Sequence, residues 1–143
     1  MKKIILLMSI LSTVLVACNQ QTYTANNISG KWEIVAINDQ AISYQGLTEI
    51  PYISFMENET QMVGNTGCNI FFGQMIIDEN NAQALRFDAV GSTKVMCANM
   101  EVEDALFAAL ANVASIDGSG NTLLLKDSNG KVLLTGKLTK ETH

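Results

Sequence analysis

The chain has 143 residues, 48% of them hydrophobic, and carries a formal net charge of −5 with one histidine and three cysteines. This length suits one domain and does not suit a multidomain enzyme. A pI of about 4.7 leaves no basic patch for a phosphate backbone, so nucleic acid is excluded as a default partner. The high apolar fraction and the odd cysteine both trace to the N-terminal segment.

Residues 1–17 have the pattern of a bacterial lipoprotein signal peptide. Two lysines precede an apolar stretch that is too short to span a bilayer, and Leu15-Val16-Ala17-Cys18 resembles a lipobox. We therefore expect cleavage before Cys18 and a lipid on its sulfur, which would anchor the chain in a membrane. An ordinary signal peptide with a chance cysteine is the alternative. Asn19 in place of an aspartate favours the outer membrane over the inner one.

Three segments are expected after the leader: a lipidated tether at 18–27, one domain at 28–138 and a tail at 139–143. The tether is predicted because its residues are polar and show no periodicity. Removal of the leader leaves 7 basic against 14 acidic residues. The resulting net negative charge would keep a tethered domain off anionic membrane surfaces.

The first half of the domain predicts strands. Trp32, Ile34 and Ala36 alternate with Lys31 and Glu33, so 31–37 is predicted as a strand buried on one face. Gly73 lies inside the longest apolar run and predicts a bulge or bend. Further strands are expected at 52–56, at 61–63 after a turn at 57–60, at 68–77, and near 85–87 after a turn at 78–81.

The second half predicts one helix followed by two hairpins. Asn99 is expected to cap the start of the helix. The acidic residues of the first turn, Glu101, Glu103 and Asp104, are expected to interact favourably with the positive end of the helix dipole. The hairpins join 114–116 to 122–125 and, through Asn129-Gly130, 123–126 to 132–138. The helix itself is predicted by apolar residues that recur at three- and four-residue spacing: Val102, Leu106, Ala109, Leu110 and Val113.

The predicted fold class is mainly β (α+β). We expect a small antiparallel barrel-like sheet of seven or eight strands, with one α-helix covering an opening or a face. The sequence shows no internal repeat.

Patterns of catalytic and metal-binding residues are missing. The only histidine is His143 at the chain end, so a Ser-His-Asp or Cys-His site lacks a base and a histidine-based zinc site lacks ligands. The acids are scattered or fall in a turn and a helix start, so we predict no metal, no cofactor and no catalytic residue. A glycosidase-type pair of carboxylates stays open, because the separation that matters is spatial.

Cys68 and Cys97 are the remaining reactive side chains. Outside the cytoplasm and without a histidine partner, they predict a structural disulfide rather than a nucleophile or a redox pair. The alternative is two buried thiols that pack as small hydrophobic groups.

The segments around these cysteines resemble the META domain. They are Gly64-Asn65-Thr66-Gly67-Cys68-Asn69, then Ser92-Thr93-Lys94-Val95-Met96-Cys97, an acidic helix, and Leu123-Leu124-Leu125 before Asn129-Gly130. The resemblance covers roughly 28–138. It implies a small antiparallel barrel-like fold with a helix, in an HslJ-like bacterial envelope lipoprotein linked to heat shock and antibiotic tolerance.

The resemblance implies no catalytic residue, so Gly67, Asn69 and Thr93 are interpreted as structural motif residues. Glycine suits a backbone conformation that a Cβ would disfavour, and asparagine can bond to a neighbouring turn through its side chain. A binding role for these positions is the less favoured interpretation.

Three hypotheses about function follow. The leading one is a monomeric, non-enzymatic envelope lipoprotein that acts in stress tolerance by binding a protein or a small hydrophobic molecule. The second is a periplasmic inhibitor of a lysozyme- or protease-type hydrolase, with a rigid loop at 64–69 and an acidity that suits a basic target. In the third, the β-structure encloses an apolar ligand, which would contact Phe71, Phe72, Met75 and Ile77. The favoured interpretation of these four residues is that they belong to the ordinary hydrophobic core.

Overall fold

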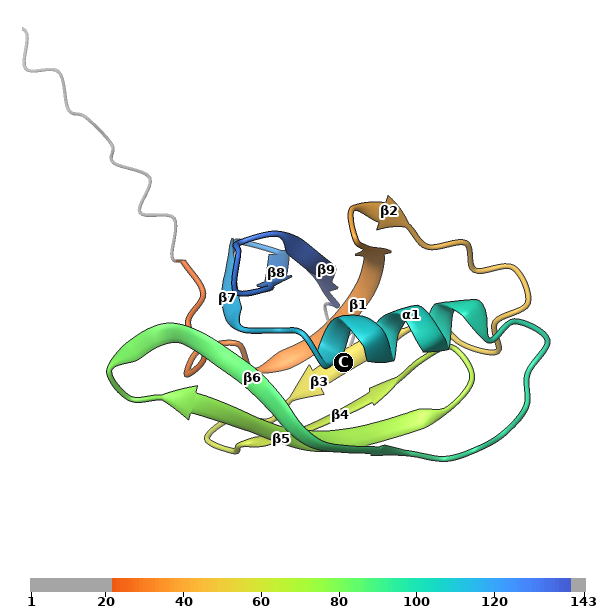
Figure 1. The fold of residues 1–143 in the computed structure, drawn as a ribbon, viewed down its shortest axis with the longest axis horizontal. Coiled ribbons are helices and arrows are strands. Elements are labelled where there is room, and N and C mark those ends of the chain that lie inside the picture. The colour runs from red at the N-terminus through yellow and green to blue at the C-terminus, as the bar shows by residue number, and fades with distance from the viewer. Residues whose placement is uncertain (1–21, 140–143) are drawn as a thin grey trace, which may run out of the picture.

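The computed structural model describes residues 22–139, which form nine strands and one helix (Figure 1). The predicted leader at 1–17, Cys18 and His143 lie outside the described residues. The strands are β1 (Gly30–Ile37), β2 (Gln40–Ala41), β3 (Tyr52–Phe55), β4 (Gln61–Asn65), β5 (Ile70–Asp78), β6 (Asn81–Ser92), β7 (Ser115–Ser119), β8 (Thr122–Lys126) and β9 (Val132–Leu138), and the helix is α1 (Glu101–Leu110).

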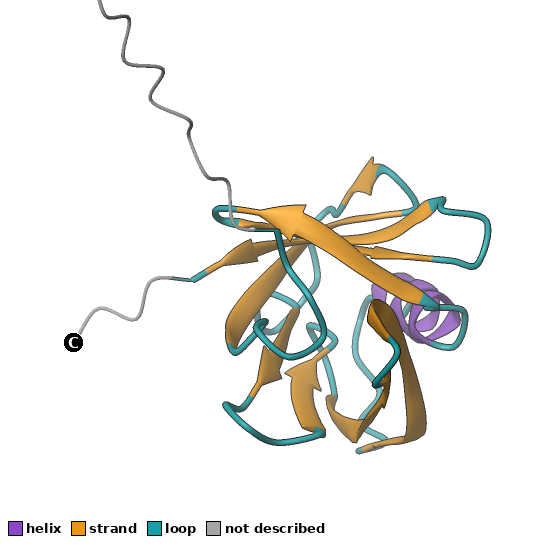
Figure 2. Ribbon diagram, turned by 90° about the vertical axis from the view of Figure 1, so that its left-hand side faces the viewer, coloured by secondary structure: helices purple, strands orange, loops and turns teal. Residues whose placement is uncertain are grey.

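Eight of the strands close into an antiparallel barrel. β1 and β3 to β9 pair in the order β1-β3-β4-β5-β6-β7-β8-β9, and β1 also pairs with β9, which closes the ring. The short β2 pairs only with β1, at the edge. Figure 1 shows α1 above β6 and beside β7 to β9, and Figure 2 shows it at the side of the barrel. The predicted fold class is confirmed.

Buried apolar side chains occupy the barrel interior. β5 shows how the pattern arises, because Phe71 and Met75 face inward while Ile70 and Phe72 face outward and are exposed. Trp32 is fully buried, and its ring N–H donates a hydrogen bond to the Ile28 carbonyl at 2.8 Å. The core also takes side chains from the remaining strands and from α1: Ile34, Ile53, Phe55, Met62, Leu85, Leu106, Leu110, Ile116, Leu123, Leu125 and Leu134.

The start of the described chain packs on the barrel. Tyr23 lies edge-on to Trp32 with 5.1 Å between ring centroids, and Ala25 is buried. The N–H of Ala25 donates to the Ala82 carbonyl at 2.9 Å. The described part of the predicted tether therefore lies against the domain, because its two apolar side chains find partners there.

The strand predictions are confirmed with differences at the boundaries. The predicted irregularity at Gly73 is present as a register shift between Phe72 and Gln74. β6 runs for 12 residues, although only 85–87 was predicted, because most of its side chains are exposed and give no apolar alternation. β5 begins at Ile70 rather than at Cys68. β7 extends into the predicted loop at 117–121.

The helix prediction is confirmed, with a shift at each end. α1 ends at Leu110, so Val113 lies beyond it but is still buried. The N-cap is Met100, which makes no side-chain capping bond. Asn99, the predicted cap, lies one residue earlier and accepts a hydrogen bond from the Glu101 N–H at 3.0 Å. It therefore still satisfies one of the free N–H groups of the first turn.

Candidate functional site

The glycine-asparagine motif at 64–69, called the motif turn below, comprises the end of β4 and the turn that leads into β5. Gly67 has φ +91°. A Cβ there would lie 2.9 Å from the Leu47 side chain, so both backbone and space require glycine. The Gly67 N–H donates to Asn65 Oδ1 at 2.7 Å, and its carbonyl accepts from the N–H and hydroxyl of Thr48 at 2.7 and 2.8 Å. Hydrogen bonds on both sides therefore hold the motif turn.

Asn69 links the motif turn to the segment that follows β6. It is 1% exposed. Its Oδ1 accepts from the Val95 N–H and from the Thr93 hydroxyl, both at 2.7 Å, and its Nδ2 donates to the Val95 carbonyl at 3.0 Å. The amide of Asn69 thus pairs with the backbone of Val95 as a strand residue would. Two of the predicted motif residues, Asn69 and Thr93, are in direct contact.

Glu103 of α1 is the buried acid of a hydrogen-bonded group, called the motif network below, that also contains Thr66, Asn69, Thr93 and Val95. It is 4% exposed, and its carboxylate accepts from the Thr66 hydroxyl at 2.6 Å and from Asn69 Nδ2 at 2.9 Å. A buried carboxylate is costly unless it is hydrogen-bonded, so these contacts tie α1 to the motif turn. The sequence pattern predicts Glu103 only as an acid at the helix start. Its spacing to Leu106 and Leu110 is the signal that places it on the buried face.

Cys68 and Cys97 form a disulfide beside this network. Their Cα atoms are 6.0 Å apart, which lies within the usual range for disulfides. The bond joins the motif turn to the segment that Asn69 holds, so the same two pieces of chain are connected covalently and by hydrogen bonds. The predicted pairing is confirmed, and the alternative of two free thiols is not what the structure contains.

An apolar groove of about 510 Å³ lies between β6 and α1. It exists because β6 pairs with β7 at a single position, Ala84 with Ser115, so the barrel wall is open beyond that pair. Phe107 lies one turn beyond Glu103 and packs edge-on against Phe71, with 5.7 Å between ring centroids. The groove is lined by Val90, Gly91, Ser92 and Lys94 on one side and by Phe107, Leu110 and Ala111 on the other.

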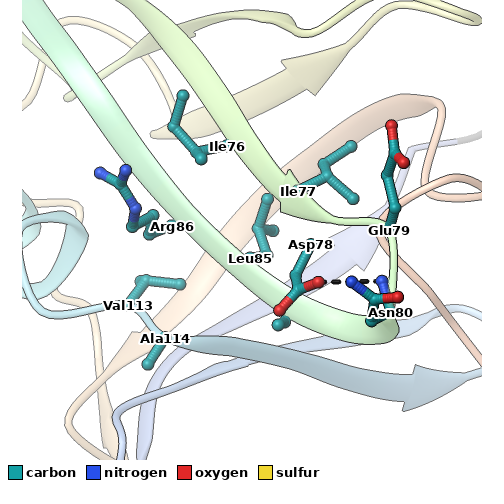
Figure 3. A pocket seen from close by; sticks show the side chains of 10 residues that line it. Ile76, Ile77, Asp78, Glu79, Asn80, Leu85, Arg86, Val113 and Ala114 are labelled. Atoms are coloured by element: carbon teal, nitrogen blue, oxygen red, sulfur yellow. Dashed lines mark hydrogen bonds between the residues drawn. The ribbon is translucent and has the colours of Figure 1, made fainter.

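A second hollow of about 570 Å³ lies at the other end of β6 (Figure 3). Ile76, Ile77 and Leu85 supply apolar lining, and Arg86 lies at one side of it. Asp78 accepts a hydrogen bond from the Asn80 N–H at 2.9 Å, so this carboxylate serves the β5–β6 turn. The hollow therefore has a mixed lining of apolar and polar residues.

The four residues of the enclosed-ligand hypothesis do not share one face. Phe71 and Met75 are buried in the barrel core, and Ile77 packs against it. Phe72 points to the outer face and is 57% exposed. Phe71, Met75 and Ile77 therefore have the core role that was the favoured interpretation.

The charged groups of the described chain form one ion pair, between Lys126 and Asp117 on the β7–β8 hairpin. Hydrogen bonds from Lys126 and from the Gly118 N–H lower the pKa of the Asp117 carboxyl below its ordinary value.

Within 22–139, no three Asp, Glu, Cys or His residues gather as metal ligands would. Over the same residues, no helix combines the length and apolar character needed to cross a membrane.

The architecture defines a class: small closed antiparallel β-barrels with one covering helix and a disulfide at a buried polar motif. The family model of the META domain matches residues 23–140. The chain therefore belongs to the META domain family, as the motif resemblance implies. No curated protein matches the chain.

Solved structures share this fold at low sequence identity. A protein determined by NMR is 23% identical, with a TM-score of 0.60 over 80% of this chain and 92% of that one. An NMR structure from Burkholderia xenovorans is 20% identical, with a TM-score of 0.60 over 78% of this chain and 83% of that one. A DUF4847 family protein from Bacteroides vulgatus is 16% identical, with a TM-score of 0.53 over 79% and 94%. At these identities the likeness concerns the fold alone.

Proposed function

We propose that the chain is a membrane-anchored envelope lipoprotein whose META domain acts, without catalysis, in tolerance of heat or antibiotic stress. The domain binds a protein or a small hydrophobic molecule in the groove between β6 and α1. The observation that carries this proposal is the groove. Its volume of about 510 Å³ is typical of a binding site, and its lining is mostly apolar, as in most small-molecule sites. The membrane anchor rests on the lipobox pattern at Cys18.

The motif network supports this function by fixing one wall of the groove. Thr93 and Val95 are both bonded to Asn69, and Lys94 lies between them in the groove lining. A disulfide holds the same segment two residues later, at Cys97. A binding wall held in this way needs little ordering when a partner arrives, which favours affinity.

Cell fractionation tests the anchor. The native chain should be found with the outer membrane, and Cys18→Ser should move it to the soluble periplasmic fraction. A Cys18→Ser chain that still fractionates with the membrane would contradict lipidation at this residue.

Survival after heat or antibiotic challenge tests the role of the groove. Ala111 is exposed on the groove wall, so Ala111→Trp fills the groove, whereas exposed Ala108 lies on α1 outside its lining. A strain lacking the protein should lose tolerance and regain it with Ala108→Trp but not with Ala111→Trp. Full rescue by Ala111→Trp would count against binding in this groove.

A hydrolase inhibitor is the second candidate, and the exposed pair Val95 and Met96 favours it. These side chains are 57% and 86% exposed and directly precede the disulfide at Cys97, as in a stapled inhibitory loop. The loop at 64–69 offers less to a target, because Asn65, Thr66 and Asn69 are buried. Inhibition of a lysozyme or protease at micromolar concentration, lost in Met96→Asp, would support this function. No inhibition across a panel of hydrolases would count against it.

A further inference from the structure

We propose that the groove between β6 and α1 receives an extended peptide segment of a partner protein, which pairs with the open edge at residues 90–94 as an added strand. This inference rests on the proposed binding function and names the class of partner. Strand addition of this kind draws its affinity from main-chain hydrogen bonds and its specificity from pockets for alternate side chains.

The open edge follows from the topology. β6 pairs with β5 as far as Ser92, but its pairing with β7 ends at Ala84, apart from one hydrogen bond from the Leu85 N–H to the Ala114 carbonyl. The rest of β6 therefore has a strand neighbour on one side only. Such an edge presents backbone N–H and C=O groups that can pair with another strand.

Hydrogen bonds show which backbone groups face the groove. The Thr93 N–H donates to the Ile70 carbonyl at 3.0 Å, and the Val95 N–H and carbonyl both pair with the Asn69 amide. Thr93 and Val95 thus direct their backbone toward the β5 side. Because successive residues of an extended chain point to alternate sides, Ser92 and Lys94 direct their backbone groups toward the groove.

The groove has side-chain space to match this edge. Phe107 and Leu110 of α1 face the edge across the groove, and Val90 adds apolar surface from the strand. A five-residue edge such as 90–94 is about 17 Å long, enough to pair with a short peptide. Alternate side chains of that peptide would bury against Phe107, while its backbone paired with Ser92 and Lys94.

Charge indicates the chemistry of the peptide. Lys94 is the single charged residue in the groove lining, and it makes no salt bridge with the described residues. A cation at the end of an apolar groove favours a peptide with a carboxylate there, from an Asp or Glu side chain or from a C-terminus. The partner segment is therefore extended, alternately apolar, and acidic at one end.

Selection from a phage-displayed library of random twelve-residue peptides tests the inference on the full chain, expressed with its own leader. The selected peptides should share alternating apolar residues and an acidic end. Hydrogen-exchange mass spectrometry with a selected synthetic peptide should show new protection of the segment that contains residues 90–94. Two peptides should be compared, one with N-methyl groups at its odd positions and one at its even positions. The set whose N–H groups pair with the edge should weaken binding by about tenfold or more, and the other set should have little effect.

Matched variants locate the site and its charge. Ala111→Trp should weaken binding by about tenfold or more by filling the groove, and Ala108→Trp should leave it unchanged. Lys94→Glu should weaken binding of the acidic peptide, whereas the same change at exposed Lys131, on the β8–β9 turn, should not.

Three results would overturn the inference. They are the selection of no peptide, equal peptide binding by the native chain and Ala111→Trp, and N-methylation that has no effect at either set of alternate positions. If no peptide is selected but the hydrophobic dye anilinonaphthalene sulfonate binds in the groove, the result favours a small apolar ligand and leaves the proposed function intact. Peptide binding at 90–94 in a protein whose loss has no tolerance phenotype would uphold the inference and reject the stress function.

Discussion

Replacing Asn69 with alanine should lower the free energy of unfolding by about 3 to 5 kcal/mol, a large share of the stability of a domain of this size. The side chain is 1% exposed and bonds to the backbone of Val95, to the Thr93 hydroxyl and to the Glu103 carboxylate. Its removal leaves the Val95 N–H and carbonyl without their side-chain partner and withdraws a donor from a buried carboxylate. A bond to a charged group contributes about 1.5–3 kcal/mol, and each neutral bond about 0.5–1.5 kcal/mol.

Urea unfolding of the oxidised protein, followed by tryptophan fluorescence, measures this loss, because Trp32 is fully buried in the core. Asn112→Ala is the matched control: Asn112 is exposed and donates one hydrogen bond, to the Ala108 carbonyl at 2.8 Å, so the change should be below about 0.5 kcal/mol. A loss below about 1 kcal/mol for Asn69→Ala would refute the view that this amide holds the segment after β6.

Three further predictions concern the disulfide, the motif glycine and the ion pair. The double change Cys68→Ser and Cys97→Ser should cost about 3.5 kcal/mol from the chain entropy of a 29-residue loop, and unchanged urea stability would contradict a structural role. Gly67→Ala should lower the free energy of unfolding by more than Gly130→Ala does. Both glycines have positive φ, but of the two only Gly67 has a neighbour within 4 Å of the added Cβ. Equal losses of stability would contradict this steric argument. Folding lowers the pKa of Asp117, so its pair contributes stability above the ordinary carboxyl pKa that is lost as the pH falls through the lowered value. Asp117→Asn should therefore reduce stability near pH 7 by no more than about 1 kcal/mol, since the pair is partly exposed, with no difference in strong acid.

Strands with local signals and a barrel-like sheet could be predicted from the sequence, but the strand pairing that closes the barrel could not. The Asn129-Gly130 turn and the alternation in β1 and β8 are local, so they indicate hairpins and strands without reference to the rest of the chain. The pairing of Trp32 with Leu138 joins the two ends of the domain, and no local pattern specifies it. β6 was underestimated because its mostly exposed side chains give no alternation.

The candidate site divides in the same way. The motif indicated Gly67, Asn69 and Thr93 as structural residues, and the structure brings the last two into contact. Glu103 was missed because an acid in the first turn of a helix is normally solvated and stabilises the helix dipole there. The groove could not be predicted, since it results from strand pairing that stops after Ala84 rather than from a residue pattern.

The motif network has a consequence for binding as well as for stability. Asn69 pairs with both backbone groups of Val95 and so keeps the chain beyond Ser92 extended, although that chain has left the sheet. The backbone of Ser92 and Lys94 then faces the groove, where a partner can reach it. Substitutions in the motif network, such as Asn69→Ala, should therefore lower both the stability of the fold and the affinity for the partner. Ala111→Trp, on the opposite wall of the groove, should lower the affinity alone. Comparing the two kinds of variant separates the stability of the motif from the role of the groove.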